Sequence, residues 1–76
     1  MKLPLLSSDK ILKILKDKGF SIVRQKGSHI SLYKKVDGKT LLVVVPKKDQ
    51  IKRGTLLSIL RQARISREEF LKIIKK

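Results

Sequence analysis

The sequence predicts one α+β domain in which a helix is followed by three antiparallel strands and then by two helices, the order α-β-β-β-α-α. Three observations predict this fold. Apolar residues recur at helical spacing on both sides of a central stretch, residues 20–45, and alternate at strand spacing within it. The pairs Gly27-Ser28 and Asp37-Gly38 divide that stretch into hairpins, and Pro46 closes it. The helices are therefore expected on one face of a three-stranded meander.

The composition predicts a small basic domain with polyanionic partners. A chain of 76 residues forms a single domain, residues 1–76, that buries roughly 60% of its unfolded surface. Twenty Lys and Arg against six Asp and Glu give a formal net charge of +14, which attracts RNA and other polyanions. A lysine-rich surface without any nucleic-acid role is the alternative interpretation. With no cysteine and one histidine, a thiolate zinc site is excluded, and we expect no metal and no cofactor.

We expect no targeting signal in the first residues of the sequence. Residues 1–6 form a short apolar run broken by Pro4, which is too short for the core of a signal peptide. No stretch reaches the length of a transmembrane helix, and the basic residues are not confined to one amphipathic helix. We expect a cytoplasmic protein without a membrane partner.

The first helix is expected over residues 8–18. Ser7 and Ser8 can each cap it, Asp9 suits its positive end, and Gly19 suits the position after its end. Its apolar face consists of Ile11, Leu12, Ile14 and Leu15.

The strands are expected over residues 20–26, 29–35 and 40–45. Gly27-Ser28 suits a two-residue type II′ turn, and Asp37-Gly38 is the strongest hairpin signal in the sequence.

Two-residue turns set the register of both hairpins. The first hairpin places Lys26 opposite His29, Arg24 opposite Ser31 and Ile22 opposite Tyr33, and the second places His29 opposite Pro46, Ser31 opposite Val44 and Tyr33 opposite Leu42. The face expected to meet the helices carries Val23, Gln25, Ile30, Leu32, Leu41, Val43 and Val45. The histidine and two cations are then together on the open face of the sheet.

A polar connection over residues 47–52 leads to two further helices. Thr55 is expected to cap the first of them, whose apolar face is Leu56, Leu57, Ile59 and Leu60. Arg64 stands where glycine would be expected, so a left-handed conformation there would be strained. Ser66 and Glu69 form a capping box that opens a last helix, which ends near residue 75. The double-stranded-RNA-binding domain has this order of elements, although a fold by itself does not assign a function.

His29 is the candidate catalytic residue. It is the only histidine, and it lies beside a Gly-Ser turn and two cations. Histidine is the side chain that ordinarily titrates near neutral pH, which suits a general base. The alternative is a basic hairpin without catalytic function.

Several segments in order and spacing resemble the HicA toxin family. They are Gly19-Phe20, the run from Arg24 through His29, Val45-Pro46, Gly54-Thr55-Leu56 and the run from Ile59 through Ala63. The resemblance implies a fold like the double-stranded-RNA-binding domain, a metal-independent mRNA interferase activity and a HicB antitoxin that silences it. The family's catalytic histidine matches His29. The chain departs from many relatives in having Lys47-Lys48 where a second histidine follows the Val-Pro pair, and Arg64 where glycine is common.

Six further residues are candidates for contacts with RNA. Cations for the phosphates are Arg24, Lys26, Lys47 and Lys48. Ser28 can donate to a phosphate or serve only the turn, and Tyr33 can stack on a base or pack against Leu42. The aliphatic patch of Ile22, Leu42 and Val44 suits an antitoxin or weak self-association.

Three functions follow as hypotheses. The leading one is a ribonuclease toxin that cleaves single-stranded mRNA through His29. The second is a non-catalytic RNA-binding module of the same fold. The third is a protein whose charge mainly serves an acidic antitoxin, which does not exclude the first.

Overall fold

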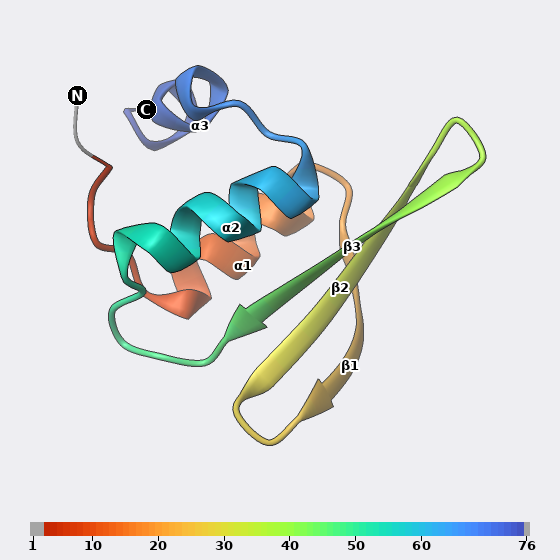
Figure 1. Cartoon of the computed structure of the whole chain (residues 1–76), viewed down its shortest axis with the longest axis horizontal. Coiled ribbons are helices and arrows are strands. Elements are labelled where there is room, and N and C mark those ends of the chain that lie inside the picture. The colour runs from red at the N-terminus through yellow and green to blue at the C-terminus, as the bar shows by residue number, and fades with distance from the viewer. Residues whose placement is uncertain (1–2, 76) are drawn as a thin grey trace.

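The computed structural model describes residues 3–75 and shows the predicted order of elements (Figure 1). The elements are α1 (Ser8–Asp17), β1 (Ser21–Lys26), β2 (His29–Val36), β3 (Lys39–Pro46), α2 (Arg53–Ala63) and α3 (Arg67–Ile74). The three strands form one antiparallel sheet in the order β1-β2-β3. The prediction of an α+β meander flanked by helices is confirmed.

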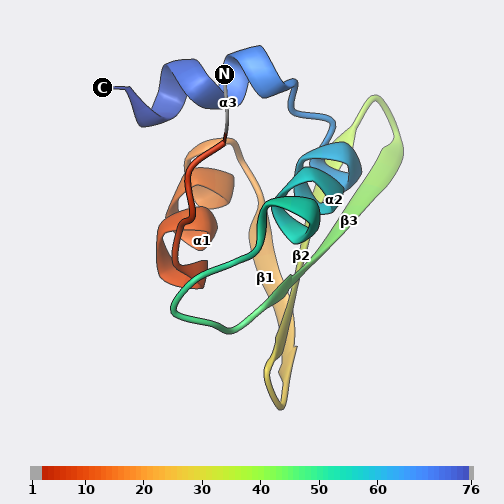
Figure 2. The same ribbon diagram turned by 60° about the vertical axis from the view of Figure 1, so that its left-hand side comes forward.

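The helices and the sheet form two layers. α1 and α2 lie side by side on one face of the sheet, and the opposite face has no helix over it (Figures 1 and 2). α3 lies beside the end of α1 that leads into β1 (Figure 2). The uncovered face is the one on which the sequence places His29.

The core lies between the two layers. On β2 and β3 the buried residues alternate with exposed ones, as predicted, and they are Ile30, Leu32, Leu41, Val43 and Val45. The helices contribute Ile11, Ile14, Leu15, Leu56, Ile59, Leu60 and Phe70. Fully burying one such side chain contributes about 1.5–3 kcal/mol, so these contacts hold the helices on the sheet. Leu57, which we expected on the buried face of α2, is instead 39% exposed.

β1 departs from the predicted register at its start. Ser21 lies opposite Tyr33 and Ile22 lies opposite Leu32, whereas the turn arithmetic placed Ile22 opposite Tyr33. The difference comes from Val23, an extra residue that bulges out of the ladder and shifts the pairing by one. A hairpin turn sets the register only as far as the first bulge.

β1 is also less buried than predicted. Val23 is 57% exposed and Gln25 is exposed, although both were expected on the face that meets the helices. Every residue of β1 is exposed. α1 and α2 cover β2 and β3, whereas β1 stays exposed. The alternation of apolar residues along β1 is therefore not sufficient to bury it.

The ends of α1 follow the predicted signals. The Ser7 Oγ accepts a hydrogen bond from the Lys10 N–H at 3.2 Å, which makes Ser7 the cap. Gly19, after the helix, has a positive φ of 100°.

α2 begins earlier than predicted. Lys52 occupies the capping position without a side-chain hydrogen bond, and its carbonyl accepts from the Leu56 N–H at 2.9 Å. The prediction of Thr55 as the cap was therefore wrong. The physical reason is tertiary, because Ile51 pairs with Leu6 and so sets the path of the chain into the helix.

The end of α2 and the start of α3 agree with the sequence. Arg64 adopts the left-handed conformation, with φ 56° and ψ 40°. The Ser66 Oγ accepts from the Glu69 N–H at 3.0 Å, as expected for a cap. None of the described helices is long and apolar enough to cross a membrane.

Candidate active site and nucleic-acid interface

His29 lies at the start of β2, between the two neighbouring strands. It is opposite Lys26 on β1 and opposite Pro46 on β3, as the two-residue turns predicted. Gly27 has a positive φ of 59°, as the first position of a type II′ turn requires. His29 is exposed, so its imidazole is accessible to a substrate from solvent.

The same face of the sheet continues away from the turn with polar and aromatic side chains. Arg24 lies opposite Ser31, two residues along β2 from His29, so both share the face of the histidine. Tyr33 follows after two more residues and lies opposite Leu42. Tyr33 is 38% exposed, so part of its side chain is covered and part is accessible to solvent.

Lys47 and Lys48 follow β3 directly beside the turn. The Lys47 N–H donates to the Ser28 carbonyl at 2.6 Å, which extends the ladder between β2 and β3 by one step beyond Pro46. The backbone of Lys47 is thereby joined to the residue that precedes His29. The side chains of Lys47 and Lys48 are exposed.

The cations around His29 are available to a ligand. Within residues 3–75, none of the side chains of Arg24, Lys26, Lys47 and Lys48 takes part in a hydrogen bond or ion pair. Free cations on an exposed surface attract phosphates over a distance of several ångströms. The structure thus places Lys26 opposite His29 and Arg24 two residues further along the same face, and Ser28 lies in the turn. It joins the backbone of Lys47 to Ser28, and Lys48 follows one residue further along the loop.

Ser8 is a residue whose place at this site the sequence did not reveal. Ser7 and Ser8 were both expected as possible caps of α1, yet Ser8 is the first residue of the helix, is 3% exposed and contacts Lys48. The sequence held one signal for this contact, because a second serine follows Ser7 although a helix needs only one capping residue.

Two other features lie outside this surface. A hollow of about 400 Å³ lies between α1 and α3, and is lined by Lys10, Lys13, Ile14, Asp17, Lys18 and Ile73. Across the described part of the chain, no group of His, Asp and Glu side chains has the arrangement of a metal site.

The family model for the HicA toxin of bacterial toxin-antitoxin systems matches residues 8–65. This chain belongs to the HicA toxin family. The matched residues include α1, the whole sheet with His29, and α2, whereas α3 follows the matched segment. No curated protein and no solved structure matches the chain.

Membership of the HicA family confirms the resemblance found in the sequence. A toxin of a toxin–antitoxin system has an antitoxin partner that holds it inactive, so the chain is the toxin member of such a pair. The HicA toxins are ribonuclease-type toxins, which agrees with the exposed cations around His29.

Proposed function

We propose that this protein is an endoribonuclease, an mRNA interferase, that cleaves single-stranded mRNA through His29 without a metal or cofactor. The observation that carries the proposal is the position of His29. In a chain of the HicA family, its one histidine is exposed on an open sheet face and is flanked in register by Lys26 and Pro46.

The reaction uses the 2′-hydroxyl of the RNA as its nucleophile. The His29 imidazole takes the proton of that hydroxyl while its oxygen attacks the adjacent phosphorus. The bond from phosphorus to the 5′ oxygen then breaks, and that oxygen takes a proton from the imidazolium or from water. The products are a 2′,3′-cyclic phosphate and a 5′-hydroxyl. A positioned general base contributes about 10²–10⁴ in rate.

The cations stabilise the charge that builds on the phosphoryl oxygens. Lys26 is the cross-strand neighbour of His29, and Arg24 lies further along the same face. Lys47 and Lys48, which follow β3, are proposed to bind neighbouring phosphates of the RNA and not the phosphate that is cleaved. Stabilisation of developing charge is usually the larger catalytic contribution, and these side chains also replace counterions on the RNA backbone.

Two uncharged residues are proposed to orient the RNA. The partly exposed ring of Tyr33 offers a surface on which an unpaired base can stack, and the Ser28 hydroxyl can donate to a phosphate beside the turn. Each has a structural role as the alternative, since Tyr33 faces Leu42 and Ser28 forms the turn.

The partner is proposed to be an acidic HicB-like antitoxin that covers the open face of the sheet. Leu42 is 58% exposed and Val44 is 37% exposed on that face. Ile22, which we expected in the same patch, lies opposite the buried Leu32 because of the bulge at Val23, so it does not share that face. An apolar patch beside a surface of net positive charge suits a partner with apolar and acidic residues. Binding there would block the access of RNA to His29, and we propose that this takes place in the cytoplasm. The same patch is the candidate surface for weak self-association.

The decisive experiment compares wild-type protein with His29→Ala on a labelled single-stranded RNA in the presence of EDTA. We expect wild-type cleavage to leave a cyclic phosphate, and the variant to be about 10²–10⁴-fold slower. Ser31→Ala, on the same strand and face, is the matched control and should retain cleavage. Full activity of a folded His29→Ala protein would exclude the mechanism.

A non-catalytic RNA-binding module remains the second candidate, because the free cations support binding with or without cleavage. It predicts intact RNA after long incubation and affinity that falls steeply with salt. Equal cutting of DNA would exclude attack by a 2′-hydroxyl.

A further inference from the structure

The segment before α1 runs antiparallel to the basic loop that follows β3. The Ile51 N–H donates to the Leu6 carbonyl at 2.7 Å, and the Arg53 Nε donates to the Leu3 carbonyl at 2.6 Å. These two segments are more than forty residues apart in the sequence, and they lie side by side in both views of the fold (Figures 1 and 2). The loop that carries Lys47 and Lys48 is therefore held by the start of the chain.

Ser8 contacts the basic loop at Lys48, two residues after Pro46. Its Oγ accepts from the Lys48 N–H at 3.1 Å, and its own N–H donates to the Lys48 carbonyl at 2.9 Å. Ser8 is the buried polar side chain among residues 3–75. A buried hydroxyl is costly unless it is hydrogen-bonded, so this pairing specifies where the Lys48 backbone lies.

The two serines at the start of α1 have separate structural roles. The Ser7 Oγ caps α1 through the Lys10 N–H, and the Ser7 carbonyl accepts from the Ile11 N–H. The Ser8 Oγ takes no part in that cap and instead bonds to a residue forty positions away. Helix capping does not account for Ser8.

The backbone of the two lysines is thus fixed from both sides. Ser28, which precedes His29, accepts from the Lys47 N–H, and Ser8 binds both the N–H and the carbonyl of Lys48. The backbone of a polar loop that is already ordered loses less conformational entropy when its side chains bind a ligand.

We propose that Ser8 is a positioning residue that holds Lys47 and Lys48 beside His29 for binding to RNA phosphates. The proposal rests on the proposed function, in which these lysines contact the RNA. Ser8 acts through the loop and does not itself touch the substrate. Because the lysines bind phosphate before and during the reaction, loss of Ser8 should raise KM and leave kcat nearly unchanged.

The experiment compares Ser8→Ala with Ser7→Ala, a matched loss of one hydroxyl at the neighbouring position. We expect Ser8→Ala to raise KM about 3–10-fold with kcat within about twofold, and to lower the steepness with which RNA affinity falls with salt. Ser7→Ala should leave KM within about twofold while weakening the helix cap. Ser8→Thr, which retains the hydroxyl, should restore KM towards the wild-type value.

Hydrogen exchange gives a measure that does not depend on cleavage. The Lys48 amide should exchange at least about tenfold faster in Ser8→Ala than in wild type, and remain slow in Ser7→Ala. Binding of the same RNA to His29→Ala, with and without Ser8→Ala, tests positioning in a protein that does not cut. If the wild-type protein leaves RNA intact, the proposed function fails, whereas these two measurements still decide the role of Ser8.

Equal KM values in Ser8→Ala and Ser7→Ala would overturn the proposal, as would an unchanged exchange rate at Lys48. If Ser8→Ala does not fold, Ser8→Cys replaces it, because the thiol occupies a similar volume but is a weak acceptor. A folded Ser8→Cys protein with wild-type KM and wild-type exchange at Lys48 would likewise overturn it.

Discussion

β1 and β3 are the two edge strands of one sheet, yet they are packed very differently. β3 buries Leu41, Val43 and Val45 beneath α2, whereas all six residues of β1 are exposed. The free edge of β3 is also partly covered, because Gln62 on α2 accepts a hydrogen bond from the Val44 N–H at 3.1 Å. β3 belongs to the core, and β1 is held mainly by its ladder to β2.

This difference places His29 between a firmly packed strand and an exposed one. On the side of β3, Pro46 and the backbone of Lys47 continue a strand that packs in the core. On the side of β1, Lys26 and Arg24 project from a strand that has no buried residue. The site therefore combines cations on a fixed backbone with cations on a more adaptable one.

The largest effect expected from this comparison is on stability. Val43→Ala on β3 removes methyl groups from a side chain that is 0% exposed, so we expect unfolding free energy to fall by about 2–3 kcal/mol. Val23→Ala on β1, the same substitution at a residue 57% exposed, should change it by less than about 0.5 kcal/mol. Urea denaturation of both variants measures the difference. Equal losses would show that β1 is part of the core.

A smaller effect is expected at the covered edge. Gln62→Ala removes the acceptor of the Val44 N–H and should cost about 0.5–1.5 kcal/mol. Gln25→Ala on the exposed strand β1 is the matched control, and should stay within about 0.5 kcal/mol of wild type. Thermal unfolding of the two proteins, followed by circular dichroism, separates them. A larger loss for Gln25→Ala would reverse the comparison.

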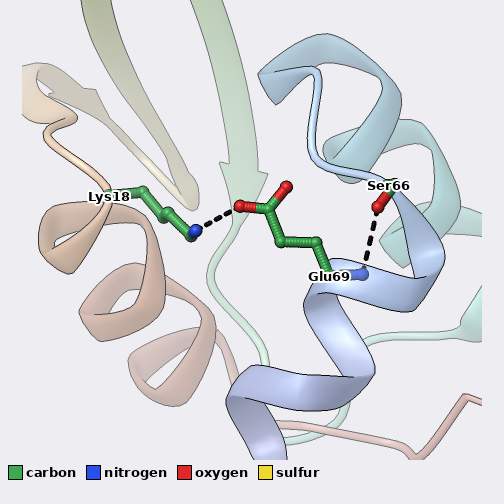
Figure 3. A network of polar contacts seen from close by, with 3 residues as sticks. All are labelled: Lys18, Ser66 and Glu69. Carbon is green, nitrogen blue, oxygen red and sulfur yellow. Dashed lines mark hydrogen bonds and ion pairs between the residues drawn. The ribbon is translucent and has the colours of Figure 1, made fainter.

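The smallest effect is expected where α3 meets the segment that leads into β1. Lys18 forms an ion pair with Glu69, whose N–H donates to the Ser66 Oγ (Figure 3). The hydrogen bond from Lys18 holds the pKa of Glu69 below its ordinary value of 4.5. The folded state then binds fewer protons than the unfolded state, so this contribution is complete above pH 4.5 and is lost as pH falls through the lowered pKa.

Glu69→Gln tests that contribution. Wild type should lose more stability than the variant between about pH 5 and pH 3, as measured by urea unfolding at each pH. The effect is the smallest of the three because the Lys18 and Glu69 side chains are 31% and 44% exposed, and solvent screens the pair. Glu68→Gln, which lies outside this ion pair, should keep the wild-type pH dependence. If the stability of Glu69→Gln falls with decreasing pH as steeply as that of wild type, another carboxylate is responsible.

Much of the site could be predicted because it depends on short-range signals. Gly27-Ser28 is a two-residue turn, and a turn of known length determines that Lys26 lies opposite His29. The roles proposed for His29 and its cations remain predictions about chemistry. The extra residue at Val23 could not be predicted, since neither its side chain nor its neighbours carry a signal for a bulge.

The sequence by itself determined the order of the elements, both hairpin turns, the aliphatic face of β2 and β3, and the position of His29 opposite Lys26 and Pro46. Periodicity and turn chemistry act over a few residues and can be read locally. Only the tertiary structure decided that β1 is left exposed, that α2 begins at Arg53, and that Ser8 binds Lys48. These features depend on which distant segments pack together, and a hydrogen bond between residues forty positions apart exists only once the core has formed.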